Sequence, residues 1–72
     1  MTHLLDIHKT LLMGEAYGLT DKQVASVVNI SLWDMKAHWR IMKAILEVES
    51  RTVAVVMALR EGIIDIEDIH KE

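Results

Sequence analysis

The sequence predicts an all-α fold of four helices in a single domain. Apolar residues recur at three- and four-residue steps along most of the chain, which is the spacing of one face of a helix. Three capping patterns divide the chain into segments, and it contains no proline and only three glycines. Its 72 residues suffice for one domain with a small core. We expect helices over roughly 4–17, 20–28, 31–46 and 50–61, a core within 4–64 and a short acidic tail over 65–72.

The first two helices are predicted from apolar spacing and from the residues that separate them. Gly18 is a natural left-handed stop for the first helix. Thr20 begins the second, with Gln23 three residues later, which is the capping-box arrangement. The valines of this segment would also suit a strand, but the cap and the lack of alternation favour a helix. The apolar face of the first helix consists of Ile7, Leu11, Leu12 and Ala16, and the apolar stripe of the second consists of Val24, Ala25, Val27 and Val28.

The third helix is predicted to have one apolar face and one cationic face. It follows the short connection of Asn29 and Ile30, and Ser31 is its expected N-cap, with Asp34 at the third position. The helical spacing predicts that the core-facing residues are Met35, Trp39, Met42 and Leu46. The opposite face presents Trp33, Lys36, Ala37, Arg40 and Lys43.

The fourth helix is apolar almost all the way round, from Arg51 to Arg60. A break over 47–49 precedes it, Ser50 is its expected cap, and Gly62 ends it. A terminal helix can bury only one face against its own core, so the surplus apolar face predicts a dimer surface. The residues expected at or near that contact are Thr52, Val53, Val56, Met57 and Arg60.

Charge is distributed unevenly along the chain. The net charge is −3, an awkward total for a nucleic-acid-binding protein. From Glu61 to the end there are five acidic residues against the single base Lys71, whereas the chain before Glu61 has a balance of +1. The segment 31–46 has a balance of +2. A weakly basic segment therefore lies within a chain whose acidity collects at its C-terminus, although both could be ordinary solvated faces.

Two helices joined by a tight turn, over 20–28 and 31–46, have the pattern of a helix-turn-helix. At these residues the sequence resembles the LuxR/GerE-type DNA-binding domain of bacterial transcription regulators. The resemblance covers about residues 11–64, and the match over 46–64 has no gap. The residues that carry the resemblance are Gly18, Thr20, Lys22, Val24, Ala25, Val28, Ile30, Ser31, Met35, Lys36, His38, Leu46, Val48, Arg51, Ala54, Val55, Ala58, Gly62, Ile63 and Ile64.

The departures from this family pattern remove positive charge. The glutamates and the arginine that usually open the first helix are missing from the stretch 4–10. The threonine near the start of the recognition helix is Asp34, and a lysine near its end is Ile45. A glycine of the pattern is Glu47, and Glu49 follows it. These changes leave the fold pattern intact and favour a role that does not require DNA.

The resemblance implies which side chains would contact DNA. Lys36 and Arg40 would reach base edges, with Ala37 between them suited to a thymine methyl group. Lys43 and Lys22 would contact the phosphate backbone. The remaining candidates are Thr20 and Ser31, whose first role is helix capping, and Trp33, which could stack on a sugar or anchor a protein partner. His38 is expected to be packed or hydrogen-bonded, not catalytic.

The sequence predicts no enzyme, cofactor or metal site. It has no cysteine, no glycine-rich phosphate loop and no set of residues suited to nucleophilic catalysis. The four histidines, His3, His8, His38 and His70, do not have metal-ligand spacing. No apolar run is long enough to span a bilayer, and the first residues lack the features of a signal peptide, so we expect a cytoplasmic location without a membrane partner.

Two hypotheses about function follow. The first is a small transcription regulator that binds duplex DNA through the 31–46 helix, as a homodimer formed through the 50–61 helix. The second is a protein-interaction module that keeps the fold without DNA binding. Such a module would pair with a full-length regulator as a heterodimer, or bind RNA polymerase, as an anti-activator or adaptor.

Overall fold

A computed structural model describes residues 4–65 of the chain, and these residues form four helices and no strand. The helices are α1 (Asp6–Tyr17), α2 (Asp21–Val28), α3 (Leu32–Leu46) and α4 (Arg51–Arg60). The all-α prediction is confirmed, and each helix begins within two residues of its expected start. The expected acidic tail lies outside the described residues except for Asp65.

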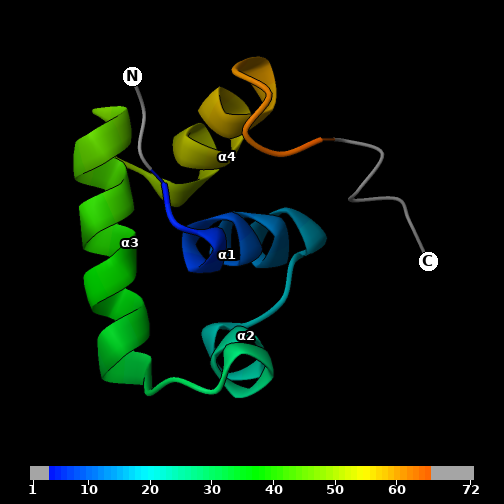
Figure 1. Cartoon of the computed structure of the whole chain (residues 1–72), viewed down its shortest axis with the longest axis vertical. Helices are drawn as coiled ribbons and strands as arrows, with labels where there is room; N and C mark the ends of the chain where they lie inside the picture. The colour runs from blue at the N-terminus through cyan, green and yellow to red at the C-terminus, as the bar shows by residue number, and fades with distance from the viewer. Residues whose placement is uncertain (1–3, 66–72) are drawn as a thin grey trace.

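The helices pack around α1, which lies between α2 and α4 (Figure 1). The longest helix, α3, runs along one side of the molecule and contacts the other three. The turn 29–31 joins α2 to α3, and the two helices cross at a steep angle in Figure 1. Among residues 4–65, no other helix covers the outer side of α3.

The core consists of apolar side chains from all four helices. The four predicted core residues of α3, namely Met35, Trp39, Met42 and Leu46, are all buried. From α1, Leu11 and Leu12 meet them, and α4 contributes two completely buried small residues, Ala54 and Ala58. Both alanines are completely buried, so this side of α4 packs against the core. The remaining buried apolar residues are Val24, Ala25 and Ile64.

Side-chain caps begin three of the helices, as the sequence predicts. The Thr20 hydroxyl accepts a hydrogen bond from the Gln23 amide at 3.1 Å, and the Thr20 amide donates to Gln23 Oε1 at 2.8 Å. The hydroxyls of Ser31 and Ser50 accept from the third amide of α3 and α4, at 3.0 and 3.1 Å. These bonds satisfy amides that have no partner within a helix.

Left-handed residues end the first three helices. Gly18, the expected stop of α1, has φ of 79°. The corresponding residues after α2 and α3 are Asn29 and Glu47, with φ of 58° and 57°. Glutamate is an unusual residue in this conformation, since a side chain crowds the backbone there. The break predicted over 47–49 is therefore confirmed. Glu47 holds the left-handed position that a glycine usually occupies at the end of a helix.

The structure adds detail to the sequence expectations for α1 and α2. Helix α1 starts at Asp6 and not near Leu4, because Leu5 is extended at the N-cap position. Val27 does not face the core: its side chain is 74% exposed. Helix α2 has eight residues and buries only Val24 and Ala25. Val27 instead lines an apolar hollow on the surface between α1 and α2. Ile7, Ala16 and Val28 are half-buried.

A buried glycine sets the distance between α1 and α2. Gly14 lies within α1, and a Cβ atom built on it would approach Cγ2 of Val24 to 2.6 Å. Carbon atoms do not come this close in folded proteins without displacement. The absence of a side chain at Gly14 therefore permits the observed packing of α2 against α1.

Arg51 links the start of α4 to the other three helices. Its guanidinium donates to both carboxylate oxygens of Asp21 in α2, at 2.6 and 3.1 Å. Its Nη1 atom also lies 3.6 Å from Oε1 of Glu15 in α1. The guanidinium carbon lies 4.7 Å from the centre of the Trp39 ring in α3. A planar guanidinium can bind a carboxylate with two bonds while stacking on an indole. This contact positions α2 and α4 relative to α3.

Candidate functional site

The outer face of α3 gathers aromatic and cationic side chains. One small hollow, of about 80 Å³, is lined by Trp33, Lys36, Ala37 and Arg40. Trp33 is 82% exposed, the largest exposed fraction among the large apolar side chains that the structure describes. Lys36 and Arg40 are exposed and lie one helical turn apart. We call these four residues and Lys43 the α3 outer face.

The α3 outer face continues toward the end of the helix, where its charge changes. Arg40 and Lys43 line a second, wide hollow together with Glu47 and Glu49. The half-buried Lys43 therefore lies near two carboxylates that follow the helix. Lys36 and Arg40 are the two exposed cations of this face, and Lys36 does not line the hollow that contains Glu47 and Glu49.

The predicted contact residues outside the α3 outer face are exposed, and two of the three already serve as helix caps. Thr20 uses both its hydroxyl and its amide within the α2 cap. Ser31 uses its hydroxyl to cap α3. Lys22 is exposed in the first turn of α2, and it does not line the hollow formed by Trp33 and Arg40.

Asp21 of α2, whose carboxylate acts on Lys36 of the α3 outer face, is paired with Arg51. The hydrogen bonds from Arg51 lower the pKa of the Asp21 carboxyl, burial partly opposes this, and the charges of Arg51 and Lys36 lower the pKa further. Asp21 is therefore a carboxylate near neutral pH, and Arg51 occupies both of its oxygens. Lys36 therefore acts on Asp21 through its charge, while Arg51 supplies the two hydrogen bonds to that carboxylate.

A pair of histidines joins α1 to the inner side of α3. His8 is 2% exposed, and its Nε2 lies 3.1 Å from Nδ1 of His38. The Leu5 amide donates to His8 Nδ1 at 3.2 Å, so this nitrogen carries no proton. The proton of neutral His8 is then on Nε2, and it is donated to His38 Nδ1. The expectation that His38 is packed or hydrogen-bonded is confirmed, and His8 must be neutral for both of its hydrogen bonds to coexist.

We expect the stability of the protein to fall as the pH decreases from 7 toward about 5. Burial, followed by the proximity of His38, lowers the pKa of His8 below its ordinary value of 6.5. As the pH falls through 6.5, the unfolded chain binds a proton at His8 before the folded chain does, so unfolding is favoured. The free energy of unfolding, measured with urea at each pH, will show this dependence.

The matched variant for this test is His8→Gln. A glutamine at this position can accept from the Leu5 amide and donate to His38, as Gln23 accepts from the Thr20 amide in α2. It does not titrate, so the variant should lose stability less steeply than the original protein over the same pH range. Equal pH dependence in the two proteins would contradict this role for His8.

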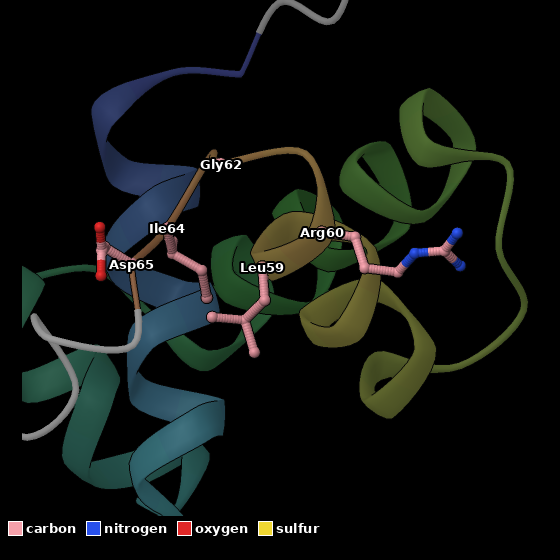
Figure 2. Close-up of a pocket in the computed structure, with 5 residues that line it drawn as sticks. All are labelled: Leu59, Arg60, Gly62, Ile64 and Asp65. Carbon is pink, nitrogen blue, oxygen red and sulfur yellow. The ribbon is translucent and has the colours of Figure 1, made fainter.

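Helix α4 presents an outer surface of mixed character. Val53 and Val56 are each 47% exposed, while Ala54 and Ala58 on the opposite side are buried. Thr52 and Arg60 are exposed and Met57 is half-buried. The surplus apolar surface predicted for this helix is therefore present. Figure 2 shows that Leu59 and Ile64 point toward one another, whereas the Arg60 side chain extends away from them.

The sequence did not predict two contacts between helices, namely Arg51 with Asp21 and His8 with His38. The roles of Arg51, Asp21 and His8 depend on contacts between residues thirty positions apart. Helical periodicity does not report such contacts. The capping pattern at Thr20–Gln23 could have suggested the same role for His8, which occupies the equivalent third position of α1.

The fold and the α3 outer face define a small all-α domain with an exposed cationic and aromatic helix. Comparisons with protein-family models, with curated proteins and with solved structures find no match. Over residues 4–65, no helix has the length and apolar character needed to cross a membrane. Within the same range, His, Asp and Glu side chains do not gather in groups of three or more that could hold a metal ion.

Proposed function

We propose that the protein is a small transcription regulator that binds duplex DNA through the α3 outer face. The observation that carries this proposal is the exposure of Lys36 and Arg40 one turn apart in one hollow, on the helix that follows a tight turn. The resemblance to LuxR/GerE-type domains supports it, because Lys36 falls on a matching position of the pattern. The proposed regulator is a dimer formed through α4.

The chemistry of the α3 outer face suits the major groove. Lys36 and Arg40 can both donate to the O6 and N7 atoms of guanine, and Ala37 can contact a thymine methyl group. Lys43 and Lys22 would contact phosphates, which adds affinity without sequence preference. Trp33 would lie against the sugar of a flanking nucleotide. A two-fold dimer would then favour a site with approximate palindromic symmetry.

We expect the protein to bind mixed-sequence duplex DNA at low salt and to lose affinity steeply as salt rises. Each phosphate contact releases counterions, so the logarithm of affinity falls linearly with the logarithm of salt concentration. The double variant Lys36→Ala, Arg40→Ala should bind at least roughly tenfold more weakly. Fluorescence anisotropy of a labelled duplex between about 50 and 200 mM salt measures both effects.

The control for lost charge is Lys9→Ala. This lysine is exposed on α1, so its replacement removes a positive charge without changing the α3 outer face. Lys36→Ala should weaken binding more than Lys9→Ala does. Equal losses would indicate binding through overall charge, and no binding at low salt would reject the DNA proposal.

The exposure of Trp33 favours one alternative, a protein-interaction module that does not bind DNA. A tryptophan that is 82% exposed beside two cations is the kind of residue that anchors protein interfaces. The acidic residues Glu47 and Glu49 at the end of the α3 outer face also disfavour a polyanion. The partner would be a full-length regulator or RNA polymerase. Regulation that is lost in Trp33→Ala, but kept in Lys36→Ala, Arg40→Ala, would support this alternative.

A further inference from the structure

The hollow of about 80 Å³ on the α3 outer face has a single small side chain in its lining, that of Ala37. This alanine is half-buried, whereas the three larger lining residues are exposed. Trp33 lies four residues before it and Arg40 three residues after it, so helical spacing places one on each side of the alanine. Lys36 completes the lining. We call this feature the Ala37 hollow.

The Ala37 hollow suits a small apolar group that has hydrogen-bond acceptors beside it. Its volume exceeds the roughly 30 Å³ that one water molecule occupies in the liquid, so a group of a few atoms fits. The methyl group of Ala37 forms no hydrogen bond, and the faces of the Trp33 ring are apolar. Lys36 and Arg40 carry only donors, at the ends of long stems that reach beyond the hollow.

The major groove of duplex DNA presents this combination of groups. Thymine carries a 5-methyl group there, and a neighbouring guanine presents its O6 and N7 acceptors. A phosphate is a poorer occupant, because a charged group would lose water against Ala37 and the Trp33 ring. Cytosine and uracil have no methyl group at this position and would leave the hollow to water. The chemistry of the lining therefore favours a methylated pyrimidine.

We infer that the Ala37 hollow receives the 5-methyl group of a pyrimidine next to a guanine, and that it makes the protein selective for 5-methylated pyrimidines. Thymine is one source of this group and 5-methylcytosine is the other. Trp33 and Ala37 contact the methyl group, while Arg40 or Lys36 donates to the guanine. This inference deepens the proposed function and rests on it, since α3 must lie in the major groove. It adds a specificity role for Trp33 and the base step that is read.

Duplexes that differ only in a methyl group test the inference. One pair is an alternating thymine–guanine strand on its complement, with and without replacement of thymine by uracil. The other pair is an alternating cytosine–guanine duplex with and without 5-methylation of cytosine. The methylated member of each pair should bind roughly fourfold more tightly, which is the value of burying one methyl group. Fluorescence anisotropy at about 50 mM salt measures the four affinities.

Two variants show whether the preference comes from the Ala37 hollow. Trp33→Ala removes one wall, and Ala37→Met fills the hollow with a side chain that suits a helix. The preference for the methylated duplexes should disappear in both variants. Lys9→Ala, on α1 and outside the hollow, should retain it. Circular dichroism checks that each variant is folded, and if Ala37→Met is not, the 82% exposed Trp33 still provides the decisive variant.

The outcomes separate this inference from the proposed function. Equal affinity for the members of both pairs would overturn methyl selectivity and leave DNA binding standing. A preference that persists undiminished in folded Trp33→Ala or Ala37→Met would also overturn it, because the preference would then come from the duplex itself or from another contact. A preference confined to one pair, and lost in the variants, identifies thymine or 5-methylcytosine as the source. No binding to any duplex at low salt would reject the proposed function, and this inference with it.

Discussion

Replacing Gly14 with alanine is expected to destabilise the protein by about 1–3 kcal/mol. Glycine within a helix normally costs stability, so the same change at an open helical site would stabilise by roughly 0.5–1 kcal/mol. Here the new Cβ atom would meet Cγ2 of Val24 at 2.6 Å. Valine is stiff at its first side-chain torsion, so α2 must move away from α1 to relieve the contact. Urea unfolding of the two proteins measures the difference.

The control for this prediction is a double-mutant cycle with Val24→Ala. Val24→Ala alone should destabilise, because it removes buried methyl groups. In that background the methyl group of Gly14→Ala has room, so its cost should shrink or change sign. Additive effects of the two substitutions would show that contact with Val24 is not the cause. A stabilising effect of Gly14→Ala alone would contradict the close packing itself.

Replacing Arg51 with methionine is expected to destabilise the protein by about 1–2 kcal/mol. The change removes both hydrogen bonds to Asp21, the proximity to Glu15 and the stacking on Trp39. The guanidinium and the Asp21 carboxylate are each about a third exposed, and solvent therefore reduces the effect below that of a buried ion pair. Thermal or urea unfolding near neutral pH measures the loss.

Arg60→Met is the matched control for Arg51→Met. Both arginines lie in α4, but Arg60 is exposed and its side chain points outward. Its replacement should change stability by no more than about 0.5 kcal/mol. Arg51→Lys should recover part of the loss, since an ammonium group keeps the charge but cannot reproduce the two-pronged bond. Equal effects of Arg51→Met and Arg60→Met would remove Arg51 from its linking role.

These two contacts bear on the α3 outer face. Arg51 binds Asp21, on which the charge of Lys36 also acts, and its guanidinium stacks on Trp39 of α3. Gly14 and Val24 set the position of α2, which leads through the short turn into α3. Variants at these positions should therefore change the orientation of α3 before they abolish folding. Loss of DNA binding in a folded Arg51→Met protein would be an indirect effect of this kind.

The sequence by itself determined the four helices and the residues that α3 turns inward and outward. Helix boundaries depend on caps such as Thr20, Ser31 and Ser50, whose bonds reach only three residues along the chain. The side of α3 that is buried follows from its spacing, since Met35, Trp39 and Met42 recur at helical steps. Local interactions of this range can be read from sequence because they do not depend on where the other helices lie.

Only the tertiary structure decided how the helices meet. It brings Arg51 to Asp21 and His8 to His38, and it turns Val27 toward solvent although its spacing suits a buried position. It also makes Gly14 a packing residue, which its place inside a helix does not indicate. The physical reason is that these outcomes depend on the crossing angles and distances between helices. Those quantities result from the joint packing of all four helices, and no single segment of the sequence determines them.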